Sequence, residues 1–201
     1  MFWYFIFFPI VGMVIIIIVA VLLGKRDRKK EAIKMEENKK NLLSSNPTQA
    51  VLQYLDNNKE ISEYTFINLE ISKTKFDILY ISKKGIFIIY PLNNEGIING
   101  EVNEENWLNK THDEFVLKNP MYNNGKDIEV ISNITSLQSG IYSIAVCTCA
   151  SEINIIDKDE EYNVCKLEEL KEVISSYPDI ISENDLVIYY NNIVNASSQG
   201  E

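Results

Sequence analysis

Apolar residues fill the start of the chain without interruption. The first 24 residues carry no charged side chain, and about 20 apolar residues are enough for a helix to cross a bilayer core. A cleaved signal peptide would have basic residues before its apolar core and a small-residue cleavage site after it, and neither occurs here. The pattern therefore predicts a retained transmembrane helix over residues 1–24.

Four later segments space their apolar residues as amphipathic helices do. The first contains Asn46, a favourable N-cap, followed by Pro47 at the first helical position. We expect the second helix to end with Gly140 as its C-terminal cap, and the last to begin with a cap at Ser182. The four predicted helices lie within residues 44–58, 125–140, 166–177 and 182–196.

The remaining apolar segments have the pattern of strands. "YTFINLEIS", "KFDILYIS" and "GIFIIY" are separated by short polar links, which predicts an antiparallel meander of three strands. The third of these segments is apolar on both faces and should lie at the centre of the sheet. We expect a short strand pair within residues 97–108, with Trp107 covering an edge of the core, and further strands within residues 141–150, 153–156 and 162–165.

This order of elements predicts the α/β class. An N-terminal transmembrane helix should precede one α/β sandwich, in which a mixed central sheet is flanked by helices. We divide the chain into a transmembrane helix (1–24), a basic and charged helical linker (25–45), one domain (46–195) and a disordered tail (196–201).

Charge separates the two ends of the chain. Residues 1–30 contain five Lys or Arg and one Asp, so the formal net charge of −10 leaves −14 on residues 31–201. Because the basic residues follow the apolar span and none precedes it, the positive-inside rule predicts a single-pass protein of the cell membrane with its C-terminal domain in the cytoplasm. The basic flank should face anionic lipids, whereas the acidic domain should repel nucleic acid.

Cysteine spacing gives no zinc motif. Cys147, Cys149 and Cys165 have no metal-site spacing to His112, the single histidine. A zinc fragment is the alternative, but buried free thiols are expected.

Several motifs together resemble the nuclease-related domain (NERD) family. They are "FDILYISKKGIFIIY", "GIING", Trp107 and "NPMYN", and the resemblance extends over residues 46–194. That family belongs to the PD-(D/E)xK nuclease-like superfamily, so the resemblance implies a restriction-endonuclease-like fold. It also implies a site where carboxylates hold Mg²⁺ and a lysine helps to orient the attacking water.

The resemblance assigns a degenerate site, in which other residue types replace most of the family's catalytic groups. Asp77 matches the family's first acid. Tyr90 stands where the family has the strand acid, and Leu92 where it has the lysine. Gln49 stands in place of the helix glutamate, and Asn123 in place of a glutamine. Tyrosine is a poor ligand for Mg²⁺, and leucine can neither bind a metal nor donate a hydrogen bond.

We therefore expect a membrane-anchored, cytoplasmic NERD-like domain that is catalytically inactive. It should need no cofactor and act by protein interaction or scaffolding, with a protein partner that the sequence does not name. Asp77 is then a polar residue at a strand end, bonded to a turn or to a neighbouring lysine.

Two alternatives stay open. The first is a metal-dependent DNA nuclease with a rearranged active site, acting for example on foreign or incoming DNA, with Asp77 as a ligand of Mg²⁺. Other groups would then replace the lost ones: Glu70, Glu95 or Glu101 for the acid, and Lys75 or Lys83 for the lysine. The second is a small membrane-anchored assembly domain whose resemblance to the family is accidental.

Overall fold

The computed structural model describes residues 34–35, 37–38, 41, 43, 45–157 and 161–198. The predicted transmembrane helix over residues 1–24 lies outside them. Among the residues that are described, no helix is both long enough and apolar enough to cross a membrane. The chain divides into residues 1–41 and 42–201, and the described residues of the first unit are helical.

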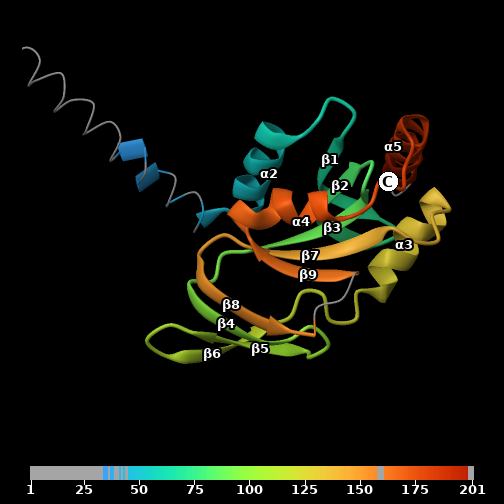
Figure 1. The fold of residues 1–201 in the computed structure, drawn as a ribbon. Helices are drawn as coiled ribbons and strands as arrows, with labels where there is room; N and C mark the ends of the chain where they lie inside the picture. The colour runs from blue at the N-terminus through green and yellow to red at the C-terminus, as the bar shows by residue number, and fades with distance from the viewer. Residues whose placement is uncertain are drawn as a thin grey trace, which may run out of the picture. The chain divides into compact units, whose positions relative to one another are not determined.

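A five-stranded mixed sheet forms the centre of the domain (Figure 1). Its strand order is β1-β2-β3-β7-β9, with antiparallel pairing from β1 to β3 and parallel pairing from β3 through β7 to β9. The strands are β1 (Tyr64–Ile71), β2 (Thr74–Ser82), β3 (Gly85–Leu92), β7 (Ile141–Cys147) and β9 (Tyr162–Lys166). The predicted meander and the central place of β3 are confirmed.

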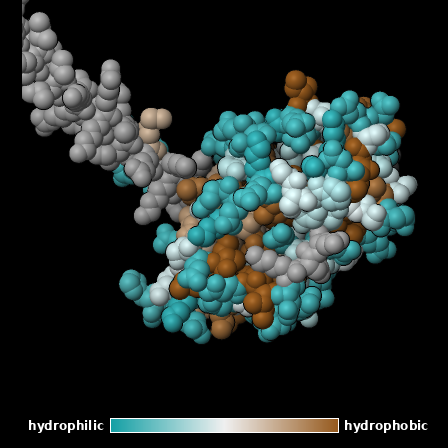
Figure 2. Space-filling view, viewed as in Figure 1, coloured by the Kyte–Doolittle hydropathy of each residue, from teal (hydrophilic) through white to brown (hydrophobic). Residues whose placement is uncertain are grey.

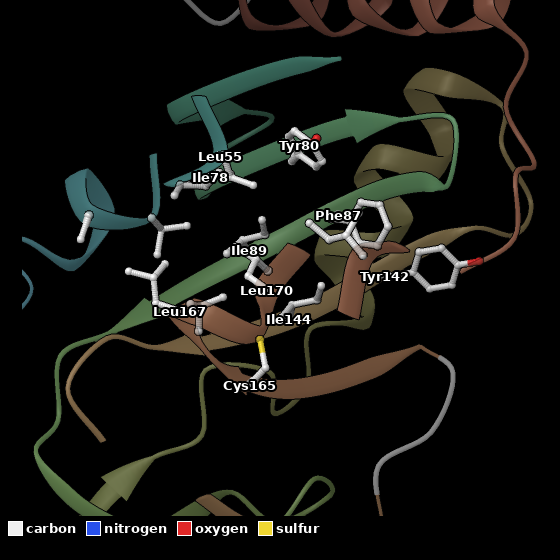
Figure 3. Packing of buried hydrophobic residues seen from close by; sticks show 14 of the residues in the cluster. Leu55, Ile78, Tyr80, Phe87, Ile89, Tyr142, Ile144, Cys165, Leu167 and Leu170 are labelled. Atoms are coloured by element: carbon white, nitrogen blue, oxygen red, sulfur yellow. The ribbon is translucent and has the colours of Figure 1, made fainter. Parts of the chain in front are cut away.

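Helices cover both faces of this sheet. One face packs against α2 (Pro47–Asn58) and α4 (Leu170–Ser176), which follows a short 3₁₀ turn at Leu167–Glu169. The other face packs against α3 (Gly125–Thr135) and α5 (Glu183–Ser198). Figure 3 shows the first core, where Leu55 of α2 and Leu170 of α4 meet Ile78 and Ile89 of the sheet. The predicted mixed sheet flanked by helices is therefore confirmed.

A second sheet was only partly expected. Its order is β6-β5-β4-β8, and β8 runs parallel to β4. Its strands are β4 (Gly96–Glu101), β5 (Asn106–Lys110), β6 (Glu114–Lys118) and β8 (Ala150–Ile156). The β4–β5 pair was predicted, whereas β6 was not. Trp107 is fully buried in the core beside this sheet, and its indole N–H donates to the carbonyl of Glu101 at 2.8 Å.

The helix ends confirm two caps and correct a third. Asn46 accepts a hydrogen bond from the N–H of Gln49 at 3.0 Å, and Ser182 accepts one from the N–H of Asp185 at 3.2 Å, as predicted. The predicted cap at Gly140 is wrong. Helix α3 ends at Thr135, because Ser136 adopts the left-handed conformation (φ 59°) and its N–H donates to the carbonyl of Ser132.

The C-terminal helix is longer than expected. It extends through Ser198, three residues into the segment assigned to a tail, and the hydroxyls of Ser197 and Ser198 donate to the carbonyl of Val194. Residues 199–201 lie outside the described residues.

One hydroxyl joins the segment before α2 to the central sheet. Thr148, just after β7, donates through Oγ1 to the carbonyl of Leu43 at 2.7 Å. Its N–H donates to the carbonyl of Leu92, at the end of β3, at 2.8 Å. The chain entering the domain is thus bonded beside two interior strands.

Candidate functional site

The candidate site begins where the pairing between β2 and β3 ends and the two strands diverge. Their pairing ends at Ile78 and Ile89, although β2 continues beside β1 to Thr74 and β3 continues beside β7 to Leu92. Pro91 has no N–H to donate and so cannot extend the ladder towards β2. Asp77 and Tyr90 are therefore the first residues beyond this pairing on the two strands.

Tyr90 lies on the face of the sheet that α3 covers. Side chains alternate along a strand, so Tyr90 shares the face of Ile88. Alternation is broken beside Asp77, because Phe76 and Leu79 belong to the same core, but the charge of Asp77 acts on the hydroxyl of Tyr90. Leu79 and Ile88 belong to the core that contains Ile131 of α3. The start of α3 can therefore complete a site with Asp77 and Tyr90.

Helix α3 supplies hydrogen-bond partners for Tyr90. The hydroxyl of Tyr90 donates to Oδ2 of Asp127, in the first turn of the helix, at 2.8 Å. The side chain of Asn124, the buried N-cap residue, hydrogen-bonds to the same hydroxyl. Asn124 also donates through Nδ2 to Oγ of the buried Ser143 on β7 at 2.5 Å. We call these five residues, Asp77, Tyr90, Asn124, Asp127 and Ser143, the fork site.

Electrostatics keep the phenol of the fork site neutral. Burial raises the pKa of Tyr90 above its ordinary value, and the charge of Asp127 and the hydrogen bond to it raise that pKa further. The negative charge of Asp77 adds a smaller effect in the same direction, whereas the hydrogen bond from Asn124 opposes it. The hydroxyl of Tyr90 therefore remains a proton donor, and its oxygen carries no charge at neutral pH.

Asp77 reaches the surface, but its carboxylate is partly shielded from water. The residue as a whole is exposed, yet burial raises the pKa of its carboxyl group above the ordinary value. An acid whose charged form is disfavoured, placed on β2 where its pairing with β3 ends, is a reasonable candidate for a functional group.

The other positions that the resemblance assigned lie in different surroundings. Leu92 lies two residues beyond Tyr90 on β3, and both side chains pack against the apolar cluster around Trp107. Gln49 belongs to α2, which packs on the opposite face of the sheet from Tyr90. Asn123 adopts a left-handed conformation before α3 (φ 62°), and it is the next residue, Asn124, that enters the fork site.

The alternative lysines have partners elsewhere. Lys83 forms a 2.7 Å ion pair with Glu183 at the opposite end of β3 from Tyr90. Lys75 lies 3.7 Å from Glu70 in an exposed pair between β1 and β2. Neither lysine occupies the place of Leu92.

The fork site does not fit Mg²⁺. That cation prefers six oxygen ligands, with carboxylates among them. Tyr90 offers a neutral oxygen whose proton is directed at Asp127. Within the described part of the chain, no three His, Cys, Asp or Glu side chains lie close enough together to hold a metal ion.

The sequence singled out Asp77 and Tyr90 but not Asn124, Asp127 and Ser143, which lie around Tyr90 in the structure. A signal for Asp127 did exist. A helix that connects two parallel strands runs antiparallel to them, so it begins near the end of the first strand. An acid in the first turn of α3 is thereby brought close to Tyr90 at the end of β3.

The motif residues that fit the family pattern have structural contacts. A Cβ atom at Gly100 would lie 2.5 Å from Cδ1 of Trp107, so the glycine makes room for the indole. Asn119 donates through Nδ2 to the carbonyls of Val102 and Glu104, both at 2.7 Å, and accepts from the N–H of Met121 at 2.9 Å. These contacts hold the second sheet and the chain that follows it in place.

Comparison with known families gives one match. A model of the nuclease-related domain (NERD) matches residues 44–149, which is more than half of the chain. No curated protein and no solved structure matches it.

Proposed function

The chain belongs to the nuclease-related domain family, and on this basis we propose that its domain is a catalytically silent member that acts by binding other proteins. The observation that carries the proposal is the hydrogen bond from Tyr90 to Asp127 at 2.8 Å. Tyr90 is then a neutral donor at the position where the resemblance implies an anionic metal ligand.

The chemistry of phosphodiester hydrolysis explains why a tyrosine in place of an acidic residue matters. A phosphodiester is anionic, and a bound metal ion offsets its charge while activating the attacking water. At the fork site the carboxylates of Asp77 and Asp127 flank a neutral phenol. Leu92 is apolar and stands where the resemblance implies a lysine. An unneutralised phosphate would be repelled by these carboxylates.

The N-terminal segment supports a location at the membrane. Residues 1–24 carry no charge, and basic residues follow them directly. A single-pass anchor of this kind would hold the acidic domain on the cytoplasmic side, with the basic flank against anionic lipid. The domain would then present its surface to other proteins at the membrane.

The surface of the domain is compatible with protein contacts. Figure 2 shows hydrophilic residues over much of one face, with hydrophobic residues gathered between them. Large apolar side chains that are exposed in the described residues include Ile61, Val116 and Ile156. Acidic and apolar groups together suit a protein partner better than a polyanion.

A nuclease assay tests the silent site. The full chain in detergent is incubated with labelled single- and double-stranded DNA and with RNA, in Mg²⁺ or Mn²⁺, beside the variant Asp77→Ala. We expect the two proteins to show the same background. Cleavage by the wild type that Asp77→Ala abolishes would disprove the proposal, provided that thermal unfolding shows both proteins to be folded.

One observation favours the alternative of a rearranged nuclease. Asp127 adds a carboxylate beside Tyr90, and carboxylate oxygens are ligands that Mg²⁺ prefers. If that alternative holds, both Asp77→Ala and Asp127→Asn should remove cleavage. The double variant Tyr90→Glu, Leu92→Lys asks the converse question: activity that appears only there would identify the two exchanged residues as the cause of silence.

A further inference from the structure

Strand β6 leaves one backbone edge open. It forms one end of the second sheet and, among the described strands, pairs with β5 alone. Phe115 and Val116 at its centre are 48% and 69% exposed. Natural sheets usually shield such edges, because a row of free N–H and C=O groups accepts another strand.

The pairing with β5 indicates which backbone groups point outward. The N–H of Asn119 donates to the carbonyl of Glu105, and the N–H of Thr111 donates to the carbonyl of Asp113, both at 2.9 Å. Hydrogen-bonded pairs alternate along an antiparallel ladder, so Phe115 and Leu117 bond to β5. The N–H and C=O groups of Glu114, Val116 and Lys118 are then directed to the open edge.

The sequence of this edge is complementary to itself. It reads "EFVLK", with an acid and a base at equal distances from Val116. We propose that a second copy of this chain pairs with β6 antiparallel, about a two-fold axis at Val116. In this register Glu114 of each copy faces Lys118 of the other, and Phe115 faces Leu117.

The backbone fits the same register. Residues that face each other at hydrogen-bonded positions exchange both of their bonds. The outward groups of Glu114, Val116 and Lys118 would all be satisfied, because these are the positions that become hydrogen-bonded pairs across the axis. A parallel arrangement would instead place Glu114 beside Glu114 and Lys118 beside Lys118, and like charges directly opposite are destabilising.

Charges at a sheet edge commonly prevent association with unrelated strands. Here their opposite signs and symmetrical placement permit one partner, the same strand in the antiparallel sense. A contact of five residues per copy is short beside a standard protein interface, so the dimer is expected to be weak. It would form whether or not the fork site cleaves phosphodiesters.

Charge reversal tests this pairing. The full chain in detergent is studied by analytical ultracentrifugation between about 1 and 100 µM, a range that covers a weak dimer. Glu114→Lys and Lys118→Glu should each weaken self-association about tenfold or more, because each variant turns both ion pairs into repulsive ones. When the two variants are mixed, they should associate with each other, because all the pairs are then attractive. The double variant should again associate with itself.

A matched control lies on another exposed strand pair. Lys75→Glu reverses a charge that faces Glu70 between β1 and β2 and should leave self-association unchanged. Circular dichroism should show that every variant is folded. A wild type that stays monomeric over the whole range, or a dimer that neither single reversal weakens, would overturn the proposal.

Discussion

A single hydroxyl determines the character of the fork site. The hydroxyl of Tyr90 donates to Asp127, so it presents a neutral donor where an acid would present an acceptor. The phenol is retained as a donor because burial and two nearby carboxylates make its ionised form unfavourable. Two predictions follow from individual side chains here, one for Asp77 and one for Tyr90.

Asp77→Asn should stabilise the protein at neutral pH. Burial raises the pKa of Asp77, so the protonated carboxyl favours the folded state. This contribution is present below the ordinary pKa of 3.8 and is lost as the pH rises through the folded pKa. We expect the melting temperature of the variant to exceed that of the wild type by about 1–2 °C at pH 7, a small gain because solvent screens the exposed side chain. The difference should shrink below about pH 4.

Asp179→Asn is the matched comparison. The hydrogen bond and charge of Lys84, 2.8 Å away, lower the pKa of Asp179, so its charged form favours the folded state. This variant should melt slightly below the wild type at pH 7. Thermal unfolding of both variants from pH 3 to 8 measures the pair, and shifts in the same direction would contradict the burial effect at Asp77.

Tyr90→Phe should lower the free energy of unfolding by about 1 kcal/mol, because Asp127 and Asn124 lose a hydrogen-bond partner. The raised pKa of Tyr90 has a second effect. Stability from the protonated phenol is present below its ordinary pKa of 10.0 and is lost as the pH rises towards the folded pKa. Part of the loss of stability that we expect for the wild type at alkaline pH should therefore be absent from the variant. Urea titrations at pH 8 and 10.5 measure both effects, with the exposed Tyr122→Phe as a control that should change neither.

At the scale of elements, the second sheet depends on close packing between β4 and β5. Gly100 lies against the indole of Trp107, which is fully buried. No side chain can be added at Gly100 unless the tryptophan moves, and the core around it is filled by Ile98 and Met121.

Gly100→Ala should therefore destabilise the domain by about 1–3 kcal/mol, the usual result of overpacking a core. Gly125→Ala provides the opposite case. A Cβ atom there meets nothing within 4 Å, and the residue begins helix α3. Alanine should be neutral or stabilising at that position by up to about 1 kcal/mol. Urea unfolding of the two variants compares them, and equal effects would mean that the contact with Trp107 is not responsible.

At the scale of the whole molecule, local patterns predicted the elements of the central sheet. The three-strand meander and α2 were predicted correctly, because alternation, helical spacing and the cap at Asn46 are each visible within a short window. Strand β6 was missed because its residues are mostly exposed and give no alternation of burial. The pairing of β4 with β8 joins segments about fifty residues apart, for which no short window holds a signal.

The fork site, like the fold, was only partly predictable from short sequence windows. Asp77 and Tyr90 come near each other as a result of the meander, whose register follows from tight turns. Asp127 and Ser143 reach the site through the packing of α3 and β7, and Asp127 lies 37 residues beyond Tyr90 in the chain. Their arrival depends on the crossover between parallel strands rather than on any local motif.

The hydrogen bonds of Thr148 to Leu43 and Leu92 have a mechanical consequence. They connect the carbonyl of Leu43 to the ends of β3 and β7, two interior strands of the central sheet. Tension drawn along the chain from its N-terminal side would be distributed into those strands instead of peeling away an outer one. We therefore expect the domain to resist mechanical unfolding when force is applied from its N-terminal side. In a variant that lacks the Thr148 hydroxyl, the force would act first on the first turn of α2.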